Sequence, residues 1–191
     1  MTEIHTPPKI HTPPKRTMPY KWGQGGGQGG DPFDDFYTYL VNSPSDAEII
    51  RLQTLHGETL DHLAVVYFQP GNPKGDEFVV DHGGPGGAWD PSFTIDLSPR
   101  GGGPRGERLV RVEMWCSNWF SGTYQLNGLR FTKATGPQDH QPFHSPVFGN
   151  ASGDYVNLDA QANGAICGFY GRHGMFIDNL GIYVRPWSEE P

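Results

Sequence analysis

Residues 164–184 read GAICGFYGRHGMFIDNLGIYV, two apolar stretches separated by a glycine-rich turn. Ala165–Tyr170 and Phe176–Val184 are rich in β-branched and aromatic residues, which favours a pair of strands. Part of this stretch, Gly174–Tyr183 (GMFIDNLGIY), has a counterpart far upstream, where Gly57–Tyr67 reads GETLDHLAVVY. Both copies place a glycine four residues before an aspartate and end on a tyrosine. A strand-and-loop unit that returns in this way predicts a fold with internal pseudo-symmetry.

A second repeat consists of paired glycines. Gly26–Asp34 reads GGQGGDPFD, and Gly83–Asp90 reads GGPGGAWD. A Gly-Gly turn exposes backbone N–H groups and lets a ligand approach the main chain closely. Beside the aspartate of a Gly-x-x-x-Asp unit, such a turn offers donors to sugar oxygens, while the carboxylate accepts charge-assisted hydrogen bonds from sugar hydroxyls. The combination favours a site for a polyol that needs neither a metal nor a nucleophile.

The same loops have other interpretations. Phosphate-binding glycine loops open a helix, whereas Phe33–Asp35 and Trp89–Phe93 lead toward expected strands. For one loop alone, glycines that only form turns and aspartates that only cap them would be the better interpretation. Two matched pairs in register favour a binding role instead. A glycosidase normally needs two carboxylates flanking one bond, and each unit supplies one, with Glu58 as an extra acid. We therefore do not expect an enzyme.

The remainder of the chain predicts an all-β protein. With 27 glycines and 18 prolines in 191 residues, turns are frequent, and no stretch keeps a helical period. Ser45–Leu55 is the one plausible helix, although its apolar residues alternate as in a strand. Besides the two strands above, we expect strands at Phe36–Leu40, Glu48–Leu55, Leu60–Phe68, Glu77–Val80, Phe93–Leu97, Arg108–Cys116 and Tyr124–Lys133.

Two segments are predicted to be loops. Ser98–Gly106 reads SPRGGGPRG, and Thr135–Gly164 is long and polar. A loop of the second length inside a compact domain is usually functional or contains short strands. Val147–Phe148 and Tyr155–Leu158 are the expected positions of such strands.

Composition and charge exclude several classes of partner. The formal net charge is −7 and no basic patch is evident, which argues against nucleic acid. No apolar run has the length of a membrane helix, so we expect no membrane insertion. The N-terminus lacks the apolar core of a secretion signal, so we expect a cytoplasmic protein, with unconventional export left open. Residues 4–15 read IHTPPK twice. We expect residues 1–20 to form a Pro-rich tail, either solvated or a docking arm, and residues 21–191 to form a single domain.

The cysteines and histidines predict no metal site. Cys116 and Cys167 are expected to be buried free thiols, with one disulfide as the alternative. In an alternating stretch, Cys116 shares a face with Val110, Val112 and Met114. Ligand spacing is lacking for His82, His140 and His144. No cofactor is expected.

The quoted stretches resemble the jacalin-related lectins, and more closely their mannose-specific branch. The landmarks are WGQGGGQGGDPFDD at residues 22–35, HGGPGGAWD at residues 82–90 and the segment 164–184. The resemblance covers nearly all of the chain from Trp22 to Trp187. It implies a β-prism I fold, in which three four-stranded Greek-key sheets surround a pseudo-threefold axis. It also implies a homo-oligomer, a dimer or higher, whose partners are mannose- or glucose-containing glycans and glycoproteins.

The resemblance also assigns two sugar sites per chain. The first falls on Gly30, Gly174, Met175, Phe176 and Asp178. In it, backbone N–H groups of Gly30, Met175 and Phe176 would donate, and Asp178 would accept from two neighbouring sugar hydroxyls. The second falls on Gly87, Gly57, Glu58, Thr59 and Asp61. There Gly87 would take the role of Gly30.

Departures from the family pattern refine these expectations. On the third sheet the family's loop would fall on Gly106, Glu107, Arg108 and Leu109, with Val110 in the acid position, so no third site is expected. In the galactose-binding branch, proteolysis frees an amine at the glycine matching Gly30. Here Gly30 lies within a continuous chain, which favours mannose or glucose. No acid cluster resembles a calcium loop, so binding is expected to be calcium-independent.

Overall fold

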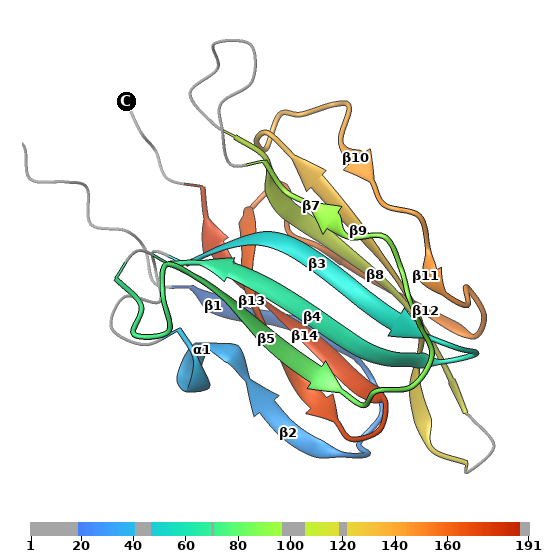
Figure 1. Ribbon diagram of the computed structural model, residues 1–191. Coiled ribbons are helices and arrows are strands. Elements are labelled where there is room, and N and C mark those ends of the chain that lie inside the picture. Colours follow the sequence, from blue (N-terminus) through green and yellow to red (C-terminus); the bar gives the residue numbers. More distant parts are fainter. Residues whose placement is uncertain (1–18, 41–46, 70, 97–105, 119–121, 188–191) are drawn as a thin grey trace, which may run out of the picture.

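The computed structural model describes residues 19–40, 47–69, 71–96, 106–118 and 122–187, and shows three antiparallel sheets around one core (Figure 1). Sheet A has the order β1-β14-β13-β2. Its strands are β1 (Tyr20–Gly26), β14 (Ile177–Pro186), β13 (Gly164–His173) and β2 (Asp31–Asp34). The tail was expected to cover residues 1–20, and residues 1–18 lie outside the described residues. The first strand, β1, already begins at Tyr20.

Sheets B and C repeat this arrangement. Sheet B has the order β5-β4-β3-β6, with β7 also paired to β3. Its strands are β3 (Glu48–His56), β4 (Leu60–Phe68), β5 (Glu77–Gly83), β6 (Ala88–Trp89) and β7 (Phe93–Thr94). Sheet C has the order β10-β9-β8-β12, with β11 also paired to β9. Its strands are β8 (Arg108–Asn118), β9 (Tyr124–Ala134), β10 (Phe143–His144), β11 (Phe148–Gly149) and β12 (Asp154–Asp159).

Each sheet is built on one central hairpin and two flanking strands. The hairpins are β13–β14, β3–β4 and β8–β9, and the flanking pairs joined by a glycine-rich loop are β1–β2, β5–β6 and β11–β12. In every sheet the strand before the glycine loop pairs with the second hairpin strand, and the strand after it pairs with the first. This threefold repetition confirms the all-β, β-prism expectation.

The core lies where the inner faces of the three sheets meet. Phe169 of sheet A, Tyr67 of sheet B and Phe131 of sheet C are fully buried. Burial of apolar surface stabilises a fold by about 25 cal/mol per Å², so such side chains hold the three sheets together. Cys116 and Cys167 are both buried and free, as expected. Burial raises the pKa of the Cys116 thiol to about 11, which keeps it protonated and unreactive.

One expected strand differs from the structure. Phe36–Leu40 is not a strand, because residues 35–38 form a short helix, α1 (Asp35–Thr38). The Asp34 carboxylate caps that helix by accepting hydrogen bonds from the backbone N–H groups of Phe36 and Tyr37, at 3.1 and 3.4 Å. The strand expected at Glu48–Leu55 is confirmed as β3, so the alternating pattern was the right guide for Ser45–Leu55 from Glu48 onward. The Ser98–Gly106 loop lies outside the described residues except at Gly106.

A buried polar cluster fixes α1 between sheets A and B. Asp35 is fully buried and accepts a hydrogen bond from the Tyr67 hydroxyl. The Phe169 backbone N–H donates to the same carboxylate oxygen at 3.3 Å, and the other carboxylate oxygen lies 2.8 Å from His82 Nε2. The ring of His82 stacks on Phe33 of β2, with centroids 3.8 Å apart. Because β2 follows the first glycine loop, this cluster holds that loop in place.

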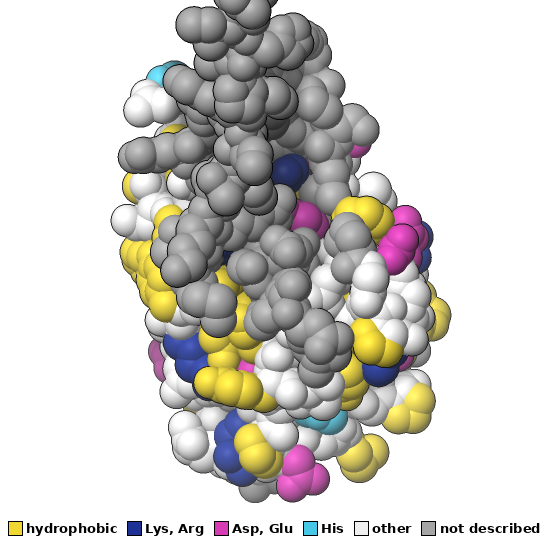
Figure 2. Space-filling model, turned by 90° about the vertical axis from the view of Figure 1, so that its left-hand side faces the viewer, with side chains coloured by type: hydrophobic (Ala, Val, Ile, Leu, Met, Phe, Trp, Pro, Cys, Tyr) yellow, Lys and Arg dark blue, Asp and Glu magenta, His cyan; other side chains and the backbone are white. Residues whose placement is uncertain are grey.

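The surface is mixed in character. On the face in Figure 2, basic, acidic and hydrophobic side chains of the described residues lie interspersed, which fits a net charge of −7 better than a nucleic-acid-binding stripe. Within the described part of the chain, no helix is long and apolar enough to cross a membrane.

Candidate functional site

The residues of each expected sugar site come together in space. In sheet A, the turn between β13 and β14 holds Gly174–Phe176, and Gly174 N–H donates to the Phe176 carbonyl at 3.0 Å. In sheet B, the turn between β3 and β4 holds Gly57–Thr59, and Gly57 N–H donates to the Thr59 carbonyl at 3.1 Å. The two turns are therefore closed by the same backbone hydrogen bond.

Glycine is required at both paired-glycine loops. Gly30 and Gly87 have φ values of +62° and +77°, a region that side chains disfavour. A Cβ at Gly30 would stand 2.6 Å from an oxygen of Asp178, and one at Gly87 would stand 2.7 Å from an oxygen of Asp61. The backbone of each glycine loop therefore lies directly against the carboxylate of its aspartate.

Asp178 is the buried acid of the first site. It is 5% exposed, and its backbone carbonyl accepts from Gly27 N–H at 2.7 Å, which attaches the β1–β2 loop. Burial raises the pKa of this carboxyl, and the positive charge of Arg172 works against that rise. The same guanidinium donates to the carbonyls of Gly29 and Gly30 at 2.8 and 2.7 Å. Arg172 therefore both orders the loop and favours an ionised Asp178.

Asp61 holds the equivalent place in the second site. It is 6% exposed, and its carbonyl accepts from Gly84 N–H at 2.9 Å. Burial raises the pKa of Asp61, while a hydrogen bond from the Gly57 backbone and the charge of His56 lower it. The His56 ring is oriented by Asp90, whose carboxylate lies 3.1 Å from Nε2. Sequence reasoning did not identify His56 or Arg172. Arg172 has no counterpart in the second copy of the repeat, whereas His56 and His173 both precede the repeated glycine, a signal that was missed.

The two sites have different shapes at their surfaces. Met175 and its counterpart Glu58 are both exposed, whereas Thr59 is 3% exposed and its counterpart Phe176 is half-buried. Glu58 is exposed, as a residue that contacts a ligand must be. The sites also adjoin, because Gly83 N–H donates to His173 Nδ1 at 3.0 Å and the backbone of Gly84 lies against that of Met175. No described residue is shared by both sets.

The third sheet was assigned wrongly from the sequence. Glu107–Val110 do not form a hairpin turn, since Glu107 is buried beside Lys133 (2.7 Å) and β8 begins at Arg108. The true equivalent of the two aspartates is Asn127, whose carbonyl accepts from Asn150 N–H at 2.9 Å. The signal was available, because residues 149–153 read GNASG, with positive φ at both end glycines.

Asn127 does not offer what the two aspartates offer. Its side-chain amide donates to Ser117 Oγ at 2.6 Å and to the Ser152 carbonyl at 3.0 Å. A neutral amide lacks the charge that strengthens hydrogen bonds from sugar hydroxyls. That only two sites bind sugar therefore stays a prediction. Its reason is now the neutral amide of Asn127 in the acid position, and not the apolar side chain of Val110.

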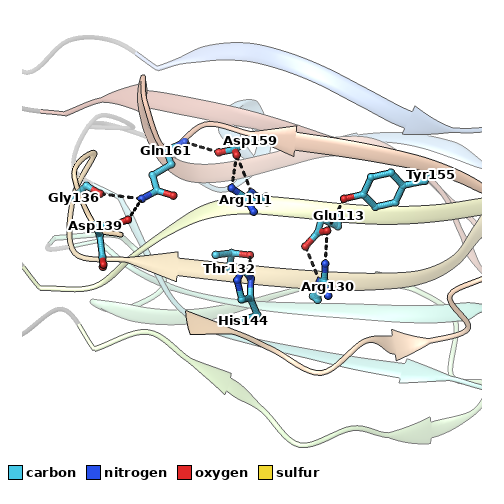
Figure 3. A network of polar contacts seen from close by, with 10 residues as sticks. All are labelled: Arg111, Glu113, Arg130, Thr132, Gly136, Asp139, His144, Tyr155, Asp159 and Gln161. Atoms are coloured by element: carbon cyan, nitrogen blue, oxygen red, sulfur yellow. Dashed lines mark hydrogen bonds and ion pairs between the residues drawn. The ribbon is translucent and has the colours of Figure 1, made fainter. Parts of the chain in front are cut away.

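Sheet C also carries a network of paired charges (Figure 3). Arg111 donates to Asp159 at 2.9 Å, and Arg130 donates to Glu113 at 2.6 Å. The pKa of Glu113 is lowered because hydrogen bonds from Arg130 and Tyr155 outweigh the effect of its burial. These charges are mutually satisfied, so the network serves the sheet itself.

Comparison with known proteins gives the family. The model of the jacalin-like lectin domain matches residues 22–183. Jacalin-related lectin 10 of Arabidopsis thaliana is 26% identical over 169 residues, which are 85% of this chain and 44% of that protein. The chain thus spans less than half the length of this relative.

Solved structures share the fold. A mannose-binding jacalin-related lectin from Ananas comosus has a TM-score of 0.67 at 22% identity, covering 88% of this chain and 99% of the other. A mannose-specific jacalin-related lectin from Morus nigra has a TM-score of 0.66 at 22% identity, covering 92% and 99%. A lectin is by definition a carbohydrate-binding protein that is not an enzyme, which agrees with the expectation from the sequence. The chain belongs to the jacalin-like lectin family.

Proposed function

We infer that the protein binds mannose- and glucose-type sugars at two sites per chain without calcium. The observation that carries this proposal is the duplicated constellation itself. In both copies a positive-φ glycine, Gly30 or Gly87, stands against a buried aspartate at the end of an exposed turn. A sugar hydroxyl is both donor and acceptor, so a carboxylate beside loop N–H groups satisfies it on both sides.

The similar proteins support the sugar class. The lectins from Ananas comosus and Morus nigra are described as mannose-binding and mannose-specific. In this chain Gly30 lies between Gly29 and Asp31 in an unbroken backbone, so no free amine stands at the first site. The proposed partners are mannose- or glucose-containing glycans and glycoproteins.

Binding at one site is expected to be weak. A shallow loop contacts few atoms of a monosaccharide, so a dissociation constant on the order of a millimolar is expected. Two sites on one chain, multiplied by a homo-oligomer if one forms, would raise the apparent affinity for a multivalent surface through avidity. Glycoprotein surfaces would then be the effective targets.

A glycan array with the purified protein tests the proposal. Signal is expected on mannose- and glucose-terminated glycans and not on galactose-terminated ones. The array is repeated in the presence of a chelator, and equal signal is expected because the site needs no metal. Loss of signal with the chelator, restored by calcium, would contradict calcium independence. A folded protein with no signal on any glycan would instead favour a β-prism interaction module with little or no sugar binding.

A further inference from the structure

The glycine loop of the second sugar site is held by a side chain from sheet A. Gly83, the last residue of β5, opens the loop that carries Gly87. Its N–H donates at 3.0 Å to Nδ1 of His173, which ends β13. His173 belongs to neither set of site residues, although it directly precedes Gly174 of the first turn. A residue next to the first site therefore contacts the loop of the second.

Gly83 is in contact with the acid of the second site as well as with His173. Its φ is +94°, and a Cβ there would stand 2.1 Å from the carbonyl oxygen of Asp61. The next residue, Gly84, donates its N–H to the same carbonyl at 2.9 Å. A displacement of Gly83 away from His173 must therefore also change its contact with Asp61. The hydrogen bond to His173 thus helps to set the spacing between Gly87 and the Asp61 carboxylate.

This hydrogen bond requires a neutral His173 ring that carries its proton on Nε2. A ring nitrogen that accepts from a backbone N–H must have a free lone pair. With a proton on Nδ1, two N–H groups would face each other at 3.0 Å, and the loop would have to move. The position of the second loop therefore depends on one nitrogen atom of sheet A staying unprotonated.

The surroundings of the His173 ring favour its neutral form. Burial lowers its pKa from 6.5. His82 of β5, whose ring centroid is 5.4 Å away, and His62 of β4 lower the pKa further. Asp31 of β2 and Asp35 of α1 work in the opposite direction. The ring is therefore neutral at neutral pH and takes up a proton in the acid range.

The first site has no equivalent contact among the described residues. Gly26 is the counterpart of Gly83, because each precedes a glycine whose N–H donates to the carbonyl of the site's aspartate. A Cβ at Gly26 would stand 2.6 Å from Leu126 of β9, an apolar side chain that cannot take up a proton. A dependence on protonation at this place is therefore confined to the second site.

His56 occupies in sheet B the position that His173 occupies in sheet A, but it responds to a proton in the opposite way. Its Nδ1 lies 3.0 Å from the Gly57 carbonyl, and its Nε2 lies 3.1 Å from a carboxylate oxygen of Asp90. Because both nitrogens face acceptors, a second proton on the His56 ring strengthens these contacts. A proton on Nδ1 of His173 breaks one. Acid therefore disturbs the second site through His173 and not through His56.

We propose that His173 is a positioning residue of the second site, whose neutral ring holds the β5–β6 loop for sugar binding and whose protonation releases that loop. The proposal rests on the sugar binding inferred above. Affinity at the second site should then fall in mild acid more than affinity at the first. By linkage, a sugar bound at the second site must make His173 harder to protonate by the same factor. Acidification would thus release glycans from one of the two sites first.

Calorimetry on the full chain compares the two sites as the pH falls. Asp178→Ala isolates the second site and Asp61→Ala isolates the first, and each is titrated with methyl α-mannoside from about pH 7.5 to about pH 5, across the usual histidine range. Burial raises the pKa of both aspartates, so the first site reports how much affinity their protonation removes. The second site should lose about fivefold more affinity, as for one lost hydrogen bond.

Substitutions of His173 in the Asp178→Ala background separate this role from a merely structural one. His173→Asn keeps an acceptor near the place of Nδ1 but takes up no proton, so it should bind mannoside at neutral pH and lose the additional acid response. His173→Leu offers no acceptor, so its affinity should be about fivefold lower already at neutral pH. The matched control is His140→Asn, an exposed histidine far along the chain from both loops, which should keep the full acid response.

NMR of the His173 ring gives the reciprocal measurement. In the Asp178→Ala chain, saturating mannoside should move the midpoint of the ring titration to an about fivefold higher proton concentration. A midpoint that ignores the sugar, or an equal acid loss at both sites, would overturn the role of His173 and leave the proposed function intact. If the wild-type chain bound no mannoside at neutral pH, the proposed function would fail together with it.

Discussion

Gly30 and Gly87 show how single residues determine the two sites. Both have positive φ, and at both a Cβ would collide with the carbonyl of a histidine at the end of the neighbouring strand, His173 or His56, at 2.5 and 2.4 Å. A substitution there should therefore displace the loop from its aspartate. The repeated glycines in the sequence were sufficient to predict these two positions.

Gly30→Ala should weaken sugar binding at the first site at least tenfold, an effect of about 1.4 kcal/mol, because the loop must move away from Asp178. Gly87→Ala should do the same at the second site. Gly71→Ala is the matched control, since Gly71 has a φ of +75° but open space where a Cβ would stand. All three variants place an alanine at a positive φ, so they share the same backbone strain and differ only in the collision of the Cβ. Calorimetry with mannose would argue against this account if the Gly71 variant lost as much binding as the other two.

His56 and Arg172 could not be identified from one sequence. Each acts through a partner distant in the chain, Asp90 or the Gly29–Gly30 carbonyls. Both partners lie in the glycine-rich repeat, but their positions in the sequence do not show that they face these two side chains. Side chains that support a site in this way become visible only when strand register is known.

The strands of the three hairpins were predictable because their residues alternate or are uniformly apolar. β4 (Leu60–Phe68) has the predicted bounds, and β3 and β9 differ by one residue at one end. β1, β2 and β6 were missed because glycine, proline and aspartate give no strand signal there. Their pairing comes from the neighbouring hairpin edges, that is, from tertiary structure. Within the predicted loop 135–164, β11 and β12 overlap the expected short strands.

The β5–β6 loop and the β13–β14 turn are linked through His173. Its Nδ1 accepts a hydrogen bond from Gly83 N–H at 3.0 Å, which requires that this nitrogen carry no proton. Burial lowers the pKa of His173 from 6.5, and the nearby His82 lowers it further. Because the folded state binds the proton less readily than the unfolded state, stability is full above the unfolded pKa and declines as the pH falls below it.

The melting temperature should therefore fall as the pH is lowered below about 6.5, and part of this fall should disappear in His173→Gln. This variant removes the titrating ring, while the buried histidine His82 is retained in both proteins. Thermal unfolding across the acid range, measured in parallel for both proteins, gives the difference. Identical pH profiles would show that His173 contributes nothing to the acid sensitivity.

At the level of the whole molecule, the described structure begins with the strand that completes sheet A. β1 pairs with β14 from Tyr20 onward, and the family match begins at Trp22. The prolines of the IHTPPK repeat cannot extend a central strand. The β-prism and its two sites are therefore expected to be independent of the repeat.

Deleting residues 1–18 should leave the melting temperature and the mannose affinity unchanged. Deleting residues 1–26 is the contrasting variant, because it removes β1, exposes the edge of β14 and takes away Gly26 of the first glycine loop. That protein should melt at a markedly lower temperature. A large drop already in the shorter deletion would show that the repeat stabilises the domain.

The pseudo-threefold arrangement also explains why the third sheet misled the sequence interpretation. Gly149–Gly153 and Asn127 keep the backbone geometry of the other two copies, whereas the acid is replaced by an amide. A copy of the repeat that keeps the backbone geometry but has lost the aspartate can be recognised from its glycines alone. The search for a third aspartate therefore led to the wrong segment, Gly106–Val110.

Calorimetric stoichiometry of Asp61→Ala and Asp178→Ala tests the central claim most directly. Loss of a charged acceptor costs about 1.5–3 kcal/mol, which is enough to abolish binding near a millimolar. The wild-type chain should bind about two mannose molecules, each single variant about one, and the folded double variant none. Two equivalent half-losses would establish two independent sites. If Asp178→Ala abolished binding while Asp61→Ala left the stoichiometry unchanged, the second constellation would be a structural repeat without function.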